Sequence, residues 1–165
     1  MNVEDTSELV VFDARTLAVG HRWPLAPGEE PTGIEYDGKN HRLYSNCRKN
    51  QLMIVLDSET GKRIAQLPIG KGVDGAAFDP KTNRAFSSNG DGTLTVVQAE
   101  SGNTFRVLEN APTQRGARTL AFDAKTGHLW TVTAEFGPAP AATTENPRPR
   151  PAILPNTFVV LEIGQ

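Results

Sequence analysis

Cysteine is almost missing from this 165-residue sequence, which contains only Cys47. A single thiol excludes an intramolecular disulfide framework and any metal site built from several cysteines. Histidine is also scarce, and the three residues, His21, His41 and His128, are too scattered to indicate a haem or copper site. We therefore predict no cofactor, with one alternative discussed below, a divalent cation held by oxygen ligands.

The sequence has no excess of one charge sign and no long apolar run. Seventeen lysines and arginines stand against 19 aspartates and glutamates, a net charge of −2. Nucleic acid is therefore not expected as a partner, since binding to it relies on positive charge. No apolar run reaches the roughly 18 residues of a membrane span. The first residues lack the basic and apolar regions of a signal peptide, so we expect neither a signal peptide nor a membrane partner, and the localisation is unassigned.

Catalytic motifs are also missing. The sequence contains no GxSxG, P-loop, GxGxxG or HExxH pattern. Ser45, Ser87 and Ser88 have no histidine nearby in the expected strand. Cys47 adjoins Arg48, which would lower the pKa of an exposed thiol, but we predict a buried, inert thiol. No catalytic residue is assigned.

A repeat dominates what is present. Residues 31–46, 73–89 and 117–133 align: each has an aromatic residue followed by aspartate, then a basic or imidazole side chain, then a second aromatic residue. The aspartates are Asp37, Asp79 and Asp123. β-rich runs that end in Thr-Gly or Ser-Gly turns recur between these segments. The pattern predicts four short strands per repeat, and a period of roughly 40–45 residues is typical of a β-propeller blade. We therefore predict an all-β fold.

Residues of the first complete repeat also carry a family resemblance: Gly33, Ile34, Tyr36, Asp37, the run 42–46, the run 54–57 and Thr60-Gly61. In these the chain resembles the YVTN-type (YncE-like) β-propeller repeat family over about residues 8–165. The resemblance implies a C-terminal half of a seven-bladed member, periplasmic or secreted as a full-length protein. It implies binding rather than catalysis, although related propellers include lactonases with a channel metal.

The blade count is about three and a half. We expect a half propeller over 8–165, divided into a half blade at 8–27, blades at 31–70 and 73–112, and a blade at 117–163 interrupted by a proline-rich insertion at 136–155. Uncovered blade faces and edges are a liability. We therefore expect a homodimer that completes a seven-bladed ring, or completion by a separate N-terminal half; an open arc is the remaining alternative.

Candidate ligand-binding residues lie where first strands begin and second strands end, on what we expect to be the upper rim of the channel. Thr32, Asp74 and Arg118 share one repeat position. Asp74 and Arg118 either form a polar pocket or neutralise each other. The loops after the second strands add six residues, of which Asn46 and Asn89 are expected to be equivalent: Asn46, Arg48, Lys49, Asn89, Asp91 and Glu135. The asparagines and acids among them serve either as turn residues or as oxygen ligands for calcium, although Asn89–Gly92 lacks the downstream acid of an EF-hand.

The insertion at 136–155 is rich in proline, which excludes it from a central strand and favours an extended path. It carries Arg148 and Arg150, which would suit an anionic ligand, and is expected to serve as a lid, a binding loop or a plain surface connection. Three functions stay open: a non-catalytic binding or scaffold propeller, a channel-centred enzyme such as a metal-dependent lactonase-like hydrolase, and a purely structural unit.

Overall fold

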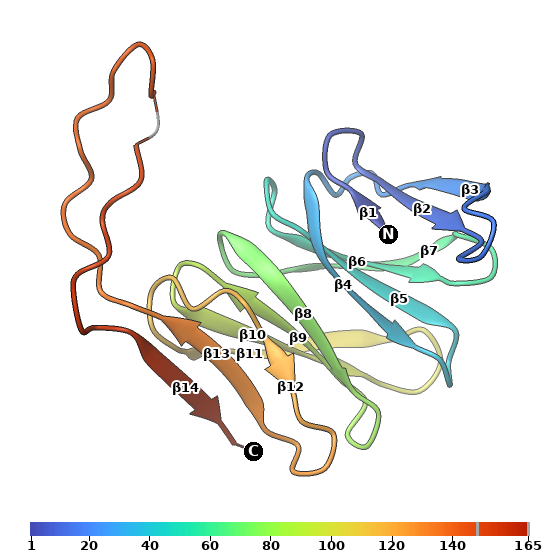
Figure 1. Ribbon diagram of the computed structural model, residues 1–165. Helices are drawn as coiled ribbons and strands as arrows, with labels where there is room; N and C mark the ends of the chain where they lie inside the picture. The colour runs from blue at the N-terminus through green and yellow to red at the C-terminus, as the bar shows by residue number, and fades with distance from the viewer. Residues whose placement is uncertain (148, 165) are drawn as a thin grey trace.

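Short runs of β-branched and aromatic residues form the strands, and Asp- and Gly-containing turns end them. The computed structural model describes residues 1–147 and 149–164, and these form four antiparallel sheets side by side (Figure 1). We number the sheets blades 1 to 4 in chain order. Blade 1 contains β1 (Asn2–Val3), β2 (Glu8–Phe12) and β3 (Val19–Pro24). Blade 2 contains β4 (Pro31–Asp37), β5 (Arg42–Cys47), β6 (Leu52–Asp57) and β7 (Arg63–Pro68).

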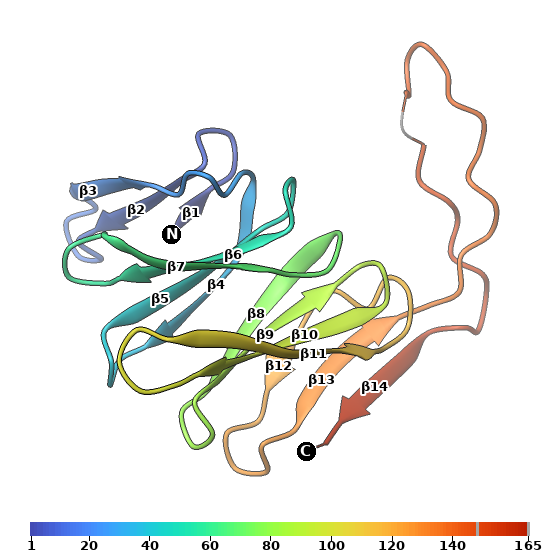
Figure 2. The same ribbon diagram turned by 180° about the vertical axis from the view of Figure 1, so that it is seen from behind.

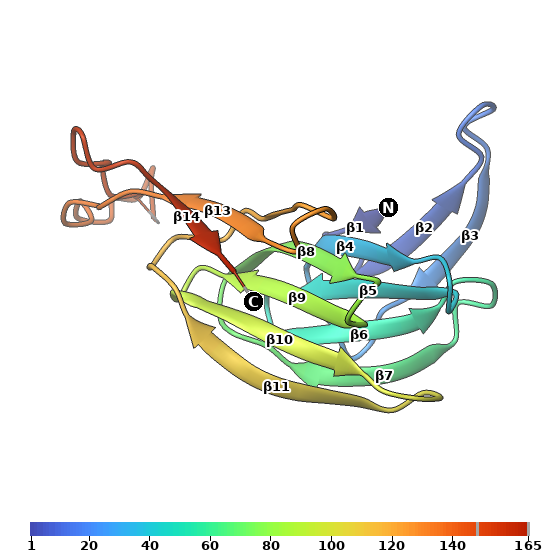
Figure 3. The same ribbon diagram turned by 90° about the horizontal axis from the view of Figure 1, so that it is seen from below.

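Blades 3 and 4 follow in the same order. Blade 3 contains β8 (Val73–Asp79), β9 (Arg84–Asn89), β10 (Thr93–Ala99) and β11 (Phe105–Pro112). Blade 4 contains β12 (Ala121–Phe122), β13 (Leu129–Thr133) and β14 (Val159–Ile163). In Figures 1 and 2 the inner strands β4, β8 and β12 lie next to one another, and Figure 3 shows the outer strands β7 and β11 on the far side of the sheets. This is the arrangement of part of a β-propeller, as the repeat predicts.

Aspartate side chains form the turns at one end of the blades. Asp37 accepts hydrogen bonds from the backbone amides of Lys39 and Asn40, and Asp79 accepts one from Lys81. Asp13, Asp57 and Asp123 make the same kind of turn. An aspartate that binds the amides two or three residues ahead closes a tight turn locally. The recurring aspartate therefore has a structural role.

The hydrophobic core lies between the blades, in three clusters. Leu9 and Trp23 of blade 1 pack on Ile54 and Leu56 of blade 2. Blades 2 and 3 enclose a second cluster around Tyr44, and blades 3 and 4 enclose a third around Phe86. Because each blade buries apolar surface only against its neighbours, the outer faces of blades 1 and 4 have no counterpart within the described part of the chain.

The strand total agrees with the expected three and a half blades, but the distribution differs. The 14 strands found in the described residues equal three and a half sets of four. Residues 8–27 were expected to form a half blade, and their sheet has gained the short strand β1. Residues 117–163 were expected to form a whole blade, and the described residues there hold three strands. The physical reason is the insertion, which takes up the chain between the end of β13 and the start of β14.

The insertion, which we call the arm (136–155), leaves the body after β13 and returns to β14. Its root is an antiparallel bridge between Phe136 and Ile153, with the Gly137 amide bound to the Ala152 carbonyl at 2.8 Å. The chain turns back where the Thr143 amide binds the Asn146 carbonyl at 3.0 Å. Figures 1 and 2 show the arm standing away from the blades. Within the described residues there is no helix that could cross a membrane.

Candidate functional site: the upper face and the root of the arm

Hydrogen bonds place the strand-two-to-three loops beside the segments that join the blades, on a side that we call the upper face. The Arg48 amide binds the Glu30 carbonyl at 2.9 Å, and the Gly90 amide binds the Gly72 carbonyl at 3.1 Å. The Gly116 amide in turn binds the Gly90 carbonyl at 2.9 Å. The loops that carry the sequence-predicted site residues thus lie on one side of the molecule.

The structure brings two of the predicted rim residues together as an ion pair. Arg118 Nε lies 3.6 Å from Asp74 Oδ2, and both side chains are partly exposed. A pair of this kind contributes little to stability, and each charge is largely compensated by the other. Thr32, the third rim residue, donates from its hydroxyl to the Val73 carbonyl at 3.2 Å and thereby links blades 2 and 3.

Asn46 and Asn89 do not occupy equivalent positions, contrary to the sequence-based expectation. Asn46 pairs with Met53, whereas Ser88 pairs with Leu94 at the corresponding place and Asn89 lies one residue further along. The reason is the place of each asparagine in its strand: both strands have six residues, and Asn46 is the fifth residue of β5, whereas Asn89 is the sixth of β9. A shift of one residue sends a strand side chain to the opposite face.

Both asparagines are fully buried and serve the fold. The amide nitrogen of Asn46 donates to the Gly75 carbonyl of blade 3 at 3.0 Å. The amide nitrogen of Asn89 donates to Thr93 and Thr95 within its own blade, each at 3.0 Å. Because the two side chains bind different partners on different faces, they do not converge on one ligand.

The proposed cation ligands are likewise engaged. Asp91 accepts from the Lys71 amide at 2.7 Å and from the Thr93 hydroxyl at 2.7 Å. Among residues 1–147 and 149–164, no three His, Cys, Asp or Glu side chains gather closely enough to hold a metal ion. Neither the calcium alternative nor the metal-dependent hydrolase therefore gains support from the described residues.

Cys47 is buried, in agreement with the predicted inert thiol. Burial raises the pKa of its thiol to about 11. The neighbouring Arg48 does not counter this, because its guanidinium pairs with Glu4 and Glu30. A thiol that stays protonated at neutral pH is a poor nucleophile.

The remaining candidates lie on or beside the arm. Arg150 is exposed on the arm, and Arg148 lies outside the described residues. Glu135 sits at the root of the arm, where its backbone amide binds the Thr157 hydroxyl at 3.0 Å and its carbonyl accepts from the Leu154 amide at 2.9 Å. These contacts fix the point from which the Glu135 carboxylate projects.

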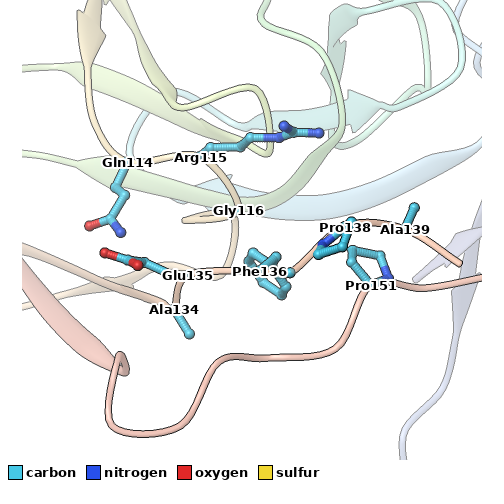
Figure 4. A pocket seen from close by; sticks show the side chains of 10 residues that line it. Gln114, Arg115, Gly116, Ala134, Glu135, Phe136, Pro138, Ala139 and Pro151 are labelled. Atoms are coloured by element: carbon cyan, nitrogen blue, oxygen red, sulfur yellow. The ribbon is translucent and has the colours of Figure 1, made fainter.

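A cavity at this root is the feature that sequence reasoning missed. It measures about 690 Å³ and lies between the 114–116 segment and the start and end of the arm (Figure 4); its walls include Gln114, Gly116, Glu135, Phe136, Pro138 and Pro151. Only Glu135 was a predicted site residue. The proline-rich composition indicated a special loop but not that its base would face the blade 3 to blade 4 connection.

No protein-family model and no curated protein matches the sequence. Solved structures do match its fold. A chain of Kuenenia stuttgartiensis hydrazine synthase superimposes with a TM-score of 0.71 at 16% identity, over 82% of this chain and 38% of that one. A chain of the mitotic checkpoint complex gives 0.67 at 15% identity, over 78% of this chain and 40% of that one. The chain thus spans about 40% of the length of these structures, and the likeness shows a β-propeller-like fold alone.

Proposed function

We propose that this chain is a non-catalytic propeller scaffold that completes its ring by association with a second copy. The observation that carries the proposal is an aromatic contact that repeats between blades and leaves one unpaired member on blade 2 and one on blade 4. Tyr44 stacks on Phe78 across blades 2 and 3, with ring centroids 5.3 Å apart, and Phe86 stacks on Phe122 across blades 3 and 4 at 6.5 Å.

The same two repeat positions are solvent-exposed on blade 4, the last blade, and on blade 2, where it faces the incomplete blade 1. Trp130 on β13 occupies the position of Tyr44 and Phe86, and it is 38% exposed. Tyr36 on β4 occupies the position of Phe78 and Phe122, and it is 51% exposed. Blade 4 and the junction of blades 1 and 2 therefore carry the two complementary halves of one inter-blade contact.

Further apolar surface accompanies each half. Val132, Phe158 and Val160 are exposed beside Trp130 on the free face of blade 4. Beside Tyr36 is a cavity at the edge of β2, which β1 covers only at residues 2–3. The cavity is lined by apolar side chains, among them Met1, Val10, Val11, Phe12, Ile34 and Leu43. Exposed patches of this kind are typical of interaction sites.

A second copy supplies an aromatic partner for Tyr36 and for Trp130. Placing β13 of one copy beside the partner's β4 restores the aromatic contact, at a place where blade 1 contributes only the two-residue strand β1 next to β2. Two copies related by a two-fold axis contribute equal numbers of blades. Symmetry therefore favours a ring with an even number of blades. A seven-bladed ring, which the sequence resemblance implies, requires an unequal partner such as a separate N-terminal half.

The test is the mass of the purified chain in solution by size exclusion with light scattering. The proposal predicts twice 17.8 kDa and a shift toward monomer in Trp130→Lys and Val160→Lys. The matched control Ile153→Lys, at an exposed position on the arm, should keep the dimer. A clean monomer at all concentrations would overturn self-association and favour completion by another chain.

A further inference from the structure

The cavity at the root of the arm is a second feature, and it needs no second copy because one chain provides all its walls. Its volume of about 690 Å³ falls in the range of small-molecule sites, roughly 300–1,000 Å³. It therefore stands apart from the exposed blade ends that carry the proposed assembly.

Both walls are held in place before any ligand arrives. On the blade side, Arg115 accepts a hydrogen bond from the Thr133 hydroxyl through its carbonyl at 2.8 Å. Gly116 has φ +84°, and a Cβ there would approach the Phe136 ring to 3.0 Å, so glycine permits the ring to lie against the backbone. On the arm side, the Phe136–Ile153 bridge fixes the other wall. Preorganised walls reduce the entropy lost on binding.

The chemistry of the walls is that of a cation site. The side chains of Gln114 and Glu135 point toward each other across the opening (Figure 4), and within the described residues neither has a side-chain hydrogen-bond partner. Phe136, Pro138 and Pro151 supply an apolar wall. Arg115 extends away from the Glu135 carboxylate in the same view, and no ion pair to that carboxylate is present among residues 1–147 and 149–164.

We propose that this pocket binds a small organic cation, a primary ammonium group joined to a flat apolar body. The ammonium group donates hydrogen bonds to the Glu135 carboxylate and to the Gln114 carbonyl oxygen. The apolar body lies against Phe136 and the prolines, where the face of the aromatic ring also attracts positive charge.

Benzylamine is the probe, and benzyl alcohol is its neutral counterpart of similar shape. Titration of the ¹⁵N-labelled protein, followed by amide NMR, should move the Gly116 and Gly137 signals with benzylamine. Binding of benzyl alcohol should be about tenfold weaker. Added salt should weaken benzylamine binding, because the carboxylate is exposed. Equal binding of the two probes, or shifts confined to other residues, would overturn the proposal.

Variants separate the charge from the ring. Glu135→Gln should weaken benzylamine binding about tenfold, whereas the control Glu145→Gln, which removes the same charge further along the arm, should leave it unchanged. Phe136→Leu keeps an apolar wall but removes the ring, and should weaken binding of both probes. Unchanged amide spectra outside the pocket establish that each variant is folded. Retained binding in Glu135→Gln would contradict the assignment of the carboxylate.

Discussion

Tyr44 and Phe78, on β5 and β8 of neighbouring blades, stack with their ring planes 18° apart. Tyr44 is fully buried, and burial raises the pKa of its hydroxyl to about 12. The guanidinium of Arg42 from the same strand lies 4.9 Å from the centre of the Phe105 ring, next to this stack. The junction between blades 2 and 3 is therefore an aromatic cluster, and it shows the contact that the exposed Tyr36 and Trp130 lack.

Removal of the buried member of the stack should destabilise the chain strongly. Tyr44→Ala is expected to cost about 3–5 kcal/mol in the free energy of unfolding, as for other large aromatic residues in cores. Tyr36→Ala, the same substitution at an exposed aromatic, should change the monomer by less than about 0.5 kcal/mol. Urea denaturation at a concentration low enough to keep the chain monomeric measures both. Similar losses for the two variants would contradict the difference in burial.

The hydrogen bond that links one blade to the next should be partly restored when its donor is exchanged for the residue type found at the same position of a neighbouring blade. Asn2, Asn46 and Ser88 occupy matching positions and donate to the Gly33, Gly75 and Arg118 carbonyls of the next blade. Asn46→Ala should cost about 1–3 kcal/mol, because it leaves a buried carbonyl without its donor. Asn46→Ser should recover part of this loss, since serine serves in blade 3. An unfolding free energy of Asn46→Ala equal to that of the unsubstituted chain would show that the hydrogen bond contributes nothing, and equal values for the two variants would show that serine does not replace it.

Stability should fall as the solution is acidified. Hydrogen bonds from the Thr60 hydroxyl and amide lower the pKa of Asp57, and those from the Thr16 and Arg15 amides lower the pKa of Asp13. A carboxyl whose pKa is lower in the folded state stabilises the fold above its unfolded value, about 3.8. That stabilisation is lost as the pH falls through the lower folded value. Thermal unfolding followed from pH 7 to pH 3 should show the decline, and Asp57→Asn should flatten it.

The thiol of Cys47 should resist modification until the chain opens. Its side chain is fully buried between blades 1 and 2, and its pKa is raised to about 11. A thiol-specific reagent at pH 8 is expected to react with the native chain far more slowly than with the chain in urea. Labelling at the same rate in both conditions would mean that the junction between blades 1 and 2 is not closed as the structure has it.

The repeat itself was visible in the sequence because each turn and each inter-blade contact needs a particular residue type. Asp37, Asp79 and Asp123 recur because each closes a turn locally, and local requirements leave a readable pattern. The rim pair Asp74 and Arg118 was found for the same reason, since both follow from repeat position.

The features that could not be predicted from the sequence depend on contacts between distant segments. The cavity at the arm root combines Gln114 with Pro151, and no local rule relates residues so far apart. The mismatch of Asn46 and Asn89 came from a shift of one position within strands of equal length, which a repeat alignment absorbs as a gap. The three strands of blade 4 likewise follow from where a long insertion leaves and rejoins the body.

The most direct test of the proposed assembly cross-links the two exposed aromatic positions, 36 and 130. A Tyr36→Cys, Trp130→Cys double variant treated with a short bismaleimide should give a covalent dimer, because the two positions meet only between copies and blade 3 separates them within one chain. The control pair Leu17→Cys, Ile153→Cys, both exposed, should stay monomeric on a denaturing gel. Absence of the covalent dimer in a sample whose solution mass is dimeric would refute this contact, and its absence in a monomeric sample would refute the assembly itself.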